Sequence, residues 1–164
     1  MDLNRKIKVM TIFDHRIKYN IVVSLGLLKT SAPSRVVNVS SRSHHFCSSL
    51  DVDDLNYEKN PFPKSHIVYG HSKLANILFT KELSEKLRGT DVTANSVHPG
   101  AVYTEIMWKG ETNLIKSIFA LLVWLMGKDE KLGAQTSIYL AVSEEVNNVT
   151  GKYYVDCKVG LSSV

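Results

Sequence analysis

Cysteine is scarce in this chain, which holds only Cys47 and Cys157 among its 164 residues. The two lie far apart, and neither belongs to a CxxC pair or to another recognisable metal-ligand spacing. The sequence therefore excludes a disulfide framework, and it predicts two free thiols in a reducing compartment.

Long apolar runs and a secretory signal are also missing. The most apolar stretch, IFALLVWLM within residues 114–126, is too short to span a bilayer, which takes about 20 residues. Residues 1–20 mix charges with short apolar clusters and lack the apolar core and the cleavage site of a signal. We assign no element to that segment.

Neither the basic nor the acidic residues cluster in one segment of the chain. Lys and Arg number 20 against 16 Asp and Glu, which gives a mild net charge of +4. This spread argues against nucleic-acid binding. Hydrophobic residues make up 44% and charged residues 22%, which is typical of a globular chain of one domain.

Apolar periodicity predicts alternating strands and helices in the rest of the chain. The first expected elements are the end of a helix over residues 21–28, a turn over 31–34 and a strand over 36–39 that ends at Ser40 and Ser41. A long polar connection over 42–65, with a turn near 52–55, leads to a helix over 67–87. The last expected elements are a strand over 92–97 closed by Pro99-Gly100, a helix over 128–142 and a strand from Gly151. The order strand, helix, strand favours an α/β fold with a parallel sheet.

Tyr69 and Lys73 lie one helical turn apart on the same face of the helix over 67–87. A phenol is a poor acid-base catalyst at neutral pH, but an adjacent ammonium stabilises the phenolate and makes it useful. Such a pair can exchange a proton with an alcohol or carbonyl oxygen. The alternative is a partly exposed tyrosine beside a solvated lysine, because Tyr-x-x-x-Lys is a common spacing.

Ser41 stands at the carboxyl end of a buried strand, where doubly wound sheets bind their ligands. Its hydroxyl could hydrogen-bond a substrate oxygen and polarise a carbonyl. The alternative for Ser40 and Ser41 is that they satisfy backbone groups at the strand end.

Three segments, VVNVSS, YGHSKLAN and VHPGAVYT, resemble the second half of a short-chain dehydrogenase/reductase. SAPSR and GAQTSIYLAVS resemble its retinol dehydrogenase branch, and the likeness covers roughly residues 23–158. The resemblance implies a Rossmann-type doubly wound parallel sheet, of which this chain holds the C-terminal part over residues 21–164. It also implies an oxidoreductase that transfers hydride between a nicotinamide cofactor and an alcohol or its carbonyl.

By the same resemblance, Ser41 holds the substrate oxygen, Tyr69 is the general acid/base, and Lys73 assists Tyr69 and holds the nicotinamide ribose. The residues that the resemblance places at the cofactor are Tyr69 and Lys73 together with Pro99, Gly100, Val102 and Thr104. NADP(H) is favoured over NAD(H), and the implied substrate is a small lipophilic alcohol or aldehyde such as retinol or retinal. No metal is expected. The implied location is the cytoplasm or the cytosolic face of an intracellular membrane.

Two family features are not found. Gly26 is the only glycine before Gly70, so the glycine-rich turn is missing, as is the N-N-A-G segment. Asn20 precedes SAPSR too closely to match the asparagine of the family's preceding helix. We therefore expect a chain without the N-terminal half, weak dinucleotide binding, and an unprotected sheet edge at residues 36–39. The rival reading is a catalytically inactive truncated variant that acts through protein association, with a homodimer through the helix over 67–87.

Three further features have alternative readings. Residues 114–126, with Trp124 inside them and Trp108 upstream, either cover the substrate cleft or make peripheral contact with a membrane. His44, His45 and Cys47 lack a fourth metal ligand at a recognisable spacing, which favours a surface loop. His98 is expected to be a packed histidine at a strand end.

Overall fold

The computed structural model describes residues 8–12, 17–47, 49–59, 65–102 and 127–163. Its strands form one sheet in the spatial order β1 (Lys8–Ile12), β2 (Ser34–Val39), β3 (Val92–His98), β4 (Tyr153–Val155) and β5 (Lys158–Val159). The helices are α1 (Ile17–Thr30), α2 (Ser65–Lys86) and α4 (Glu130–Val142), with short 3-10 helices η1 (Arg42–Phe46) and η3 (Glu144–Val146). Strands β1 to β4 run parallel, and β5 is antiparallel to β4.

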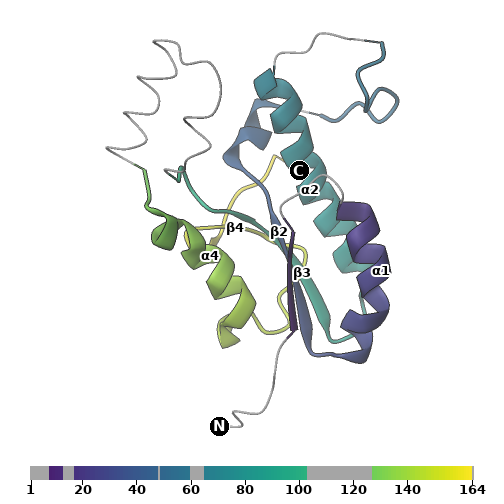
Figure 1. The fold of residues 1–164 in the computed structure, drawn as a ribbon, viewed down its shortest axis with the longest axis vertical. Helices are drawn as coiled ribbons and strands as arrows, with labels where there is room; N and C mark the ends of the chain where they lie inside the picture. The colour runs from purple at the N-terminus through teal and green to yellow at the C-terminus, as the bar shows by residue number, and fades with distance from the viewer. Residues whose placement is uncertain (1–7, 13–16, 48, 60–64, 103–126, 164) are drawn as a thin grey trace.

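Helices cover both faces of the sheet, with α1 and α2 on one side and α4 on the other (Figure 1). The α2 side has an apolar cluster of Leu28, Val36, Leu83, Leu87, Val92 and Ala94. The α4 side has a second cluster of Val37, Val39, Val97, Leu140, Val146 and Tyr154. All six residues of β2 are buried, including the polar Ser34, Arg35 and Asn38, which fits a central strand of a parallel sheet that is covered on both faces.

The helices over 67–87 and 128–142 and the strands over 36–39 and 92–97 are confirmed, with boundaries that shift by a few residues. The predicted helix end before the turn is α1, and residues 52–55 contain turns. None of the helices in the described ranges is long and apolar enough to cross a membrane.

Three expectations from the sequence are wrong. The segment with His44, His45 and Cys47 is not a surface loop, because it forms η1 with His44 and Cys47 buried against the rest of the fold. The segment from Gly151 is a hairpin of β4 and β5 and not one strand, because Asp156 and Cys157 both take positive φ (51° and 59°) and reverse the chain. Residues 36–39 are not an edge, because β1 pairs with β2 in parallel, with Met10 opposite Val36. At five residues, β1 is too short to show a periodic pattern. The 3-10 helix η1 was also not predicted.

Candidate active site

The expected site residues in the described ranges lie toward the carboxyl ends of the parallel strands. Ser41 follows β2, the Pro99-Gly100 turn follows β3, and Tyr69 and Lys73 lie in the first turns of α2. The carboxyl ends of parallel strands lie at the same end of the sheet, and doubly wound sheets bind ligands there. Thr104, Trp108 and residues 114–126 lie outside the described residues.

Lys73 lies between Tyr69 and the end of β2. Its Nζ is 5.4 Å from the centroid of the Tyr69 ring, and it donates a hydrogen bond to the carbonyl oxygen of Val39 at 3.3 Å. Burial lowers the pKa of Lys73. The Tyr69 side chain is 49% exposed, so its ring is open to solvent while the ammonium behind it is partly desolvated. A charge in that setting acts more strongly on its neighbours than one in water.

Other hydrogen bonds hold this end of α2 against β2. Asn76 Nδ2 donates to the same Val39 oxygen at 3.1 Å, and Ser40 Oγ donates to the carbonyl oxygen of Lys73 at 2.8 Å. We did not single out Asn76 in the sequence. It lies about two turns beyond Tyr69 on the same helix face, and that spacing was the available signal.

Gly70 lets η1 approach the turn of α2 that carries Tyr69. A Cβ atom at Gly70 would lie 2.7 Å from both Cys47 Sγ and the carbonyl oxygen of Ser43. Ser41 caps η1, and its Oγ accepts from the backbone N–H of Ser43 at 3.2 Å. The missing side chain at Gly70 therefore brings the segment after Ser41 against the helix that carries Tyr69. Gly70 could not be singled out from the sequence, because a glycine inside a helix has no positional signature.

The Pro99-Gly100 turn is held between β3 and the start of α4. Gly100 has φ +96°, and a Cβ there would lie 2.9 Å from Lys128 Cδ. The backbone N–H of Lys128 donates to the Ala101 carbonyl at 2.8 Å. A Cβ at Gly133 would lie 2.5 Å from Val102 Cγ2, so that glycine lets α4 approach Val102. A turn with this backbone shape at the carboxyl end of a parallel strand is suited to hold the nicotinamide-ribose end of a dinucleotide.

A layer of buried polar side chains lies beside the site. Asn38 Nδ2 donates to Thr80 Oγ1 at 2.8 Å, and His44, His98 and Tyr153 are buried. Burial raises the pKa of Tyr153 to about 12. Within the described ranges, His44 Nε2, His98 Nδ1 and the Tyr153 hydroxyl make no hydrogen bond. His98 is thus a packed histidine, as expected from its position.

Acid is expected to destabilise the fold through His98. Burial, followed by the charge of Arg42, lowers the pKa of His98 from 6.5 to about 4. Between these values the unfolded chain binds a proton that the folded chain does not bind, so stability decreases as the pH falls. From pH 7.5 to pH 5 we expect the free energy of unfolding to fall by about 2 kcal/mol, which urea titrations at the two pH values would measure.

The control for this prediction is His98→Gln, which has no titrating group at this position. We expect the variant to lose the part of the decrease that comes from His98 between pH 7.5 and pH 5, a range that lies above the ordinary pKa values of carboxyl groups. The decrease that remains is expected from His44, because burial also lowers its pKa. An equally steep decrease in the variant would assign the acid sensitivity to other groups.

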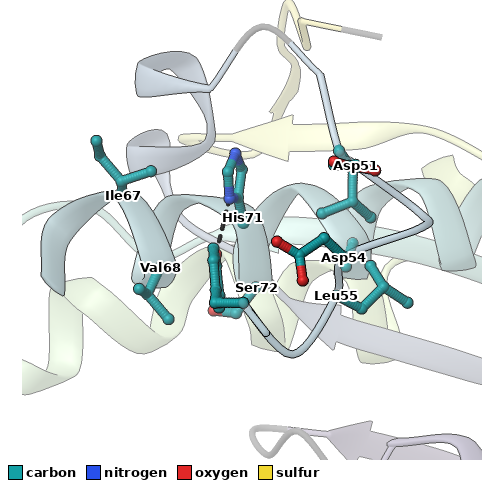
Figure 2. A pocket seen from close by; sticks show the side chains of 10 residues that line it. Asp51, Asp54, Leu55, Ile67, Val68, His71 and Ser72 are labelled. Carbon is teal, nitrogen blue, oxygen red and sulfur yellow. Dashed lines mark hydrogen bonds between the residues drawn. The ribbon is translucent and has the colours of Figure 1, made fainter. Parts of the chain in front are cut away.

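A cavity of ≈ 360 Å³ lies on the other face of α2 (Figure 2). Its walls come from the 50–57 segment and from Ile67, Val68, His71, Ser72 and Ala75. The Tyr57 hydroxyl lies 2.8 Å from His71 Nδ1 and ties the segment to the helix. Neither Tyr69 nor Lys73 lines this cavity, so it is separate from the candidate active site.

Comparison with known proteins supports the family. Residues 58–114, which include Tyr69 and Lys73, match the short chain dehydrogenase family model. The chain is 50% identical over 135 residues to retinol dehydrogenase 14 of Homo sapiens, with 82% of this chain and 39% of that protein covered. It is 46% identical over 133 residues to retinol dehydrogenase 13 of Mus musculus, covering 79% and 39%. The chain thus spans about 40% of the length of the curated relatives that it matches.

Solved structures agree on the fold. Salutaridine reductase from Papaver somniferum superposes with a TM-score of 0.58 at 21% identity, covering 84% of this chain and 50% of that one. A short-chain dehydrogenase/reductase of unknown function from Caenorhabditis elegans gives a TM-score of 0.61 at 18% identity, covering 85% and 49%. With the parallel sheet, these neighbours show a Rossmann-type α/β fold. The chain is similar to members of the short-chain dehydrogenase/reductase family, among them the retinol dehydrogenases.

Proposed function

We propose that this site catalyses reversible hydride transfer between a nicotinamide cofactor and an alcohol or its carbonyl. The observation that carries the proposal is the position of the Lys73 ammonium. It lies 5.4 Å from the Tyr69 ring centroid and donates a hydrogen bond to the carbonyl oxygen of Val39, the last residue of β2. The cofactor, when bound, supplies or accepts the hydride. The residues of the chain handle the proton and the substrate oxygen.

In the direction of carbonyl reduction, Ser41 donates a hydrogen bond to the substrate oxygen and polarises the carbonyl. Tyr69 gives its phenolic proton to that oxygen as negative charge develops there. Lys73 stabilises the negative charge left on the Tyr69 oxygen and, together with the turn at Pro99, Gly100 and Val102, holds the nicotinamide ribose. Alcohol oxidation follows the same path in reverse. Thr104 completes this cofactor set in the proposal.

The proposed cofactor is NADP(H) in preference to NAD(H), and the proposed substrate is a lipophilic primary alcohol or its aldehyde. Relatives named retinol dehydrogenase 14 and 13 support a retinoid-like substrate. We also propose peripheral contact with the cytosolic face of an intracellular membrane, where such a substrate accumulates, and a homodimer through α2.

A steady-state assay tests the proposal. The chain is mixed with all-trans-retinal and NADPH, and the loss of NADPH absorbance is followed with and without the aldehyde. The proposal expects an aldehyde-dependent loss that scales with the concentration of the chain. Absence of turnover at high concentrations of chain and cofactor, with the fold intact by circular dichroism, would contradict it.

A further inference from the structure

His44 is a buried side chain that the proton transfer described above does not use. It lies in η1 with an exposed fraction of 0%. Its ring makes an edge contact with Tyr153 at a centroid distance of 5.0 Å and lies 4.0 Å from the ring of His45. Burial lowers the pKa of His44, which keeps the ring neutral near pH 7. A neutral imidazole has one N–H donor and one bare acceptor nitrogen.

The hydrogen bonds of His44 fix which nitrogen carries the proton. Nδ1 lies 2.6 Å from the carbonyl oxygen of Ser41. Since a carbonyl oxygen only accepts, Nδ1 must be the N–H donor and Nε2 the bare nitrogen. The backbone N–H of His44 donates to the same oxygen at 3.3 Å. Two N–H groups of His44, one from its ring and one from its backbone, therefore bind the carbonyl oxygen of Ser41.

The side chain of Ser41 is bound more weakly than its carbonyl. Its Oγ accepts from the Ser43 N–H at 3.2 Å and donates to Ser43 Oγ at 3.2 Å, both long for hydrogen bonds of these types. The hydroxyl can therefore turn toward a substrate oxygen at small cost, provided that the backbone of Ser41 stays in place. Ser41 has extended backbone angles of φ −155° and ψ 155°.

We infer that His44 is a positioning residue, whose Nδ1–H holds the Ser41 carbonyl and thereby aims the Ser41 hydroxyl at the substrate oxygen. The catalytic consequence rests on the proposed function, whereas the hydrogen bond itself does not. Gly70 supports the same arrangement, because it lets η1 lie against α2 with His44 on its inner side.

The first test is spectroscopic and needs no turnover. In the uniformly ¹⁵N/¹³C-labelled chain, two-bond ¹H–¹⁵N correlations at neutral pH report the His44 tautomer. We expect the Nδ1–H form, and the Nε2–H form would overturn the inference.

His44→Asn places an amide donor near the position of Nδ1, and His44→Leu removes the donor. We expect the Ser41 carbonyl ¹³C shift to be kept in His44→Asn and displaced in His44→Leu, and an unchanged shift in His44→Leu would also overturn the inference.

The second test is kinetic. His44→Leu is expected to lower kcat by about 10-fold to 100-fold, as misplacement of a reacting group does, with little change in the KM for NADPH. His44→Asn should restore most of the rate. In a Ser41→Ala background, His44→Leu should have no further effect, because the group that it positions is gone. An equal loss in both backgrounds would show a merely structural role. If the wild-type chain does not turn over, the proposed function fails, and the tautomer and the Ser41 shift still decide the His44 contact.

Discussion

Tyr69→Phe is expected to lower kcat/KM for an aldehyde by a factor on the order of 10² to 10⁴, the range for loss of a general acid/base. The change removes one hydroxyl and keeps the ring that lies 5.4 Å from Lys73 Nζ. Since Tyr69 is 49% exposed, the substitution empties no packed volume. We therefore expect an unchanged free energy of unfolding and nearly unchanged cofactor binding, measured by urea titration and by calorimetry.

Tyr139→Phe is the matched control for this substitution. Tyr139 has its hydroxyl at the surface, where it donates to Glu145 Oε2 at 2.8 Å, and it lies in α4, away from the candidate active site. It should retain wild-type turnover. If Tyr69→Phe retains it as well, Tyr69 does not transfer the proton.

Gly70→Ala is expected to destabilise the chain, although alanine normally stabilises a helix interior relative to glycine by about 1 kcal/mol. The added methyl group would lie 2.7 Å from the backbone oxygen of Ser43, which cannot move without displacing η1. Overpacking of this kind costs about 1–3 kcal/mol, and the shift of η1 should also lower turnover through Ser41. Urea unfolding at neutral pH measures the first effect and the aldehyde assay the second.

Gly26→Ala tests the same substitution where no clash exists. Gly26 is inside α1, and a Cβ atom there has no neighbour within 4 Å. We expect it to raise the free energy of unfolding by about 0.5–1 kcal/mol, opposite in sign to Gly70→Ala. Equal signs for the two variants would mean that η1 is not packed against α2 as described.

Most of the fold could be predicted from sequence, because strong local signals mark its central elements. VVNV is buried on both faces of the sheet, and α2 ends near Gly89, which has φ +78°. The parts that were missed depend on contacts distant in sequence or on single backbone angles. β1 becomes a strand by pairing with β2, and the hairpin of β4 and β5 depends on the positive φ angles of Asp156 and Cys157.

The candidate site also combines residues that could be predicted from the sequence with residues that could not. The helical spacing of Tyr69 and Lys73 could be read directly, since both lie on one helix face. The proposed role of Ser41 follows from its position directly after a strand, because ligands bind at the carboxyl ends of the strands in doubly wound sheets. The contributions of Gly70, Asn76 and His44 could not be predicted, because each depends on a contact between η1 or β2 and another part of the fold.

Deuteride transfer from the cofactor to retinal would show the proposed reaction itself. The chain is incubated with all-trans-retinal and NADPH that carries deuterium at the transferable position of its nicotinamide ring, and the retinol is analysed by mass spectrometry. Hydride transfer supported by Tyr69 and Lys73 predicts retinol with one deuterium from the wild-type chain, and almost none from Tyr69→Phe over the same time. Unlabelled retinol only, or equal labelling by both proteins, would contradict the account.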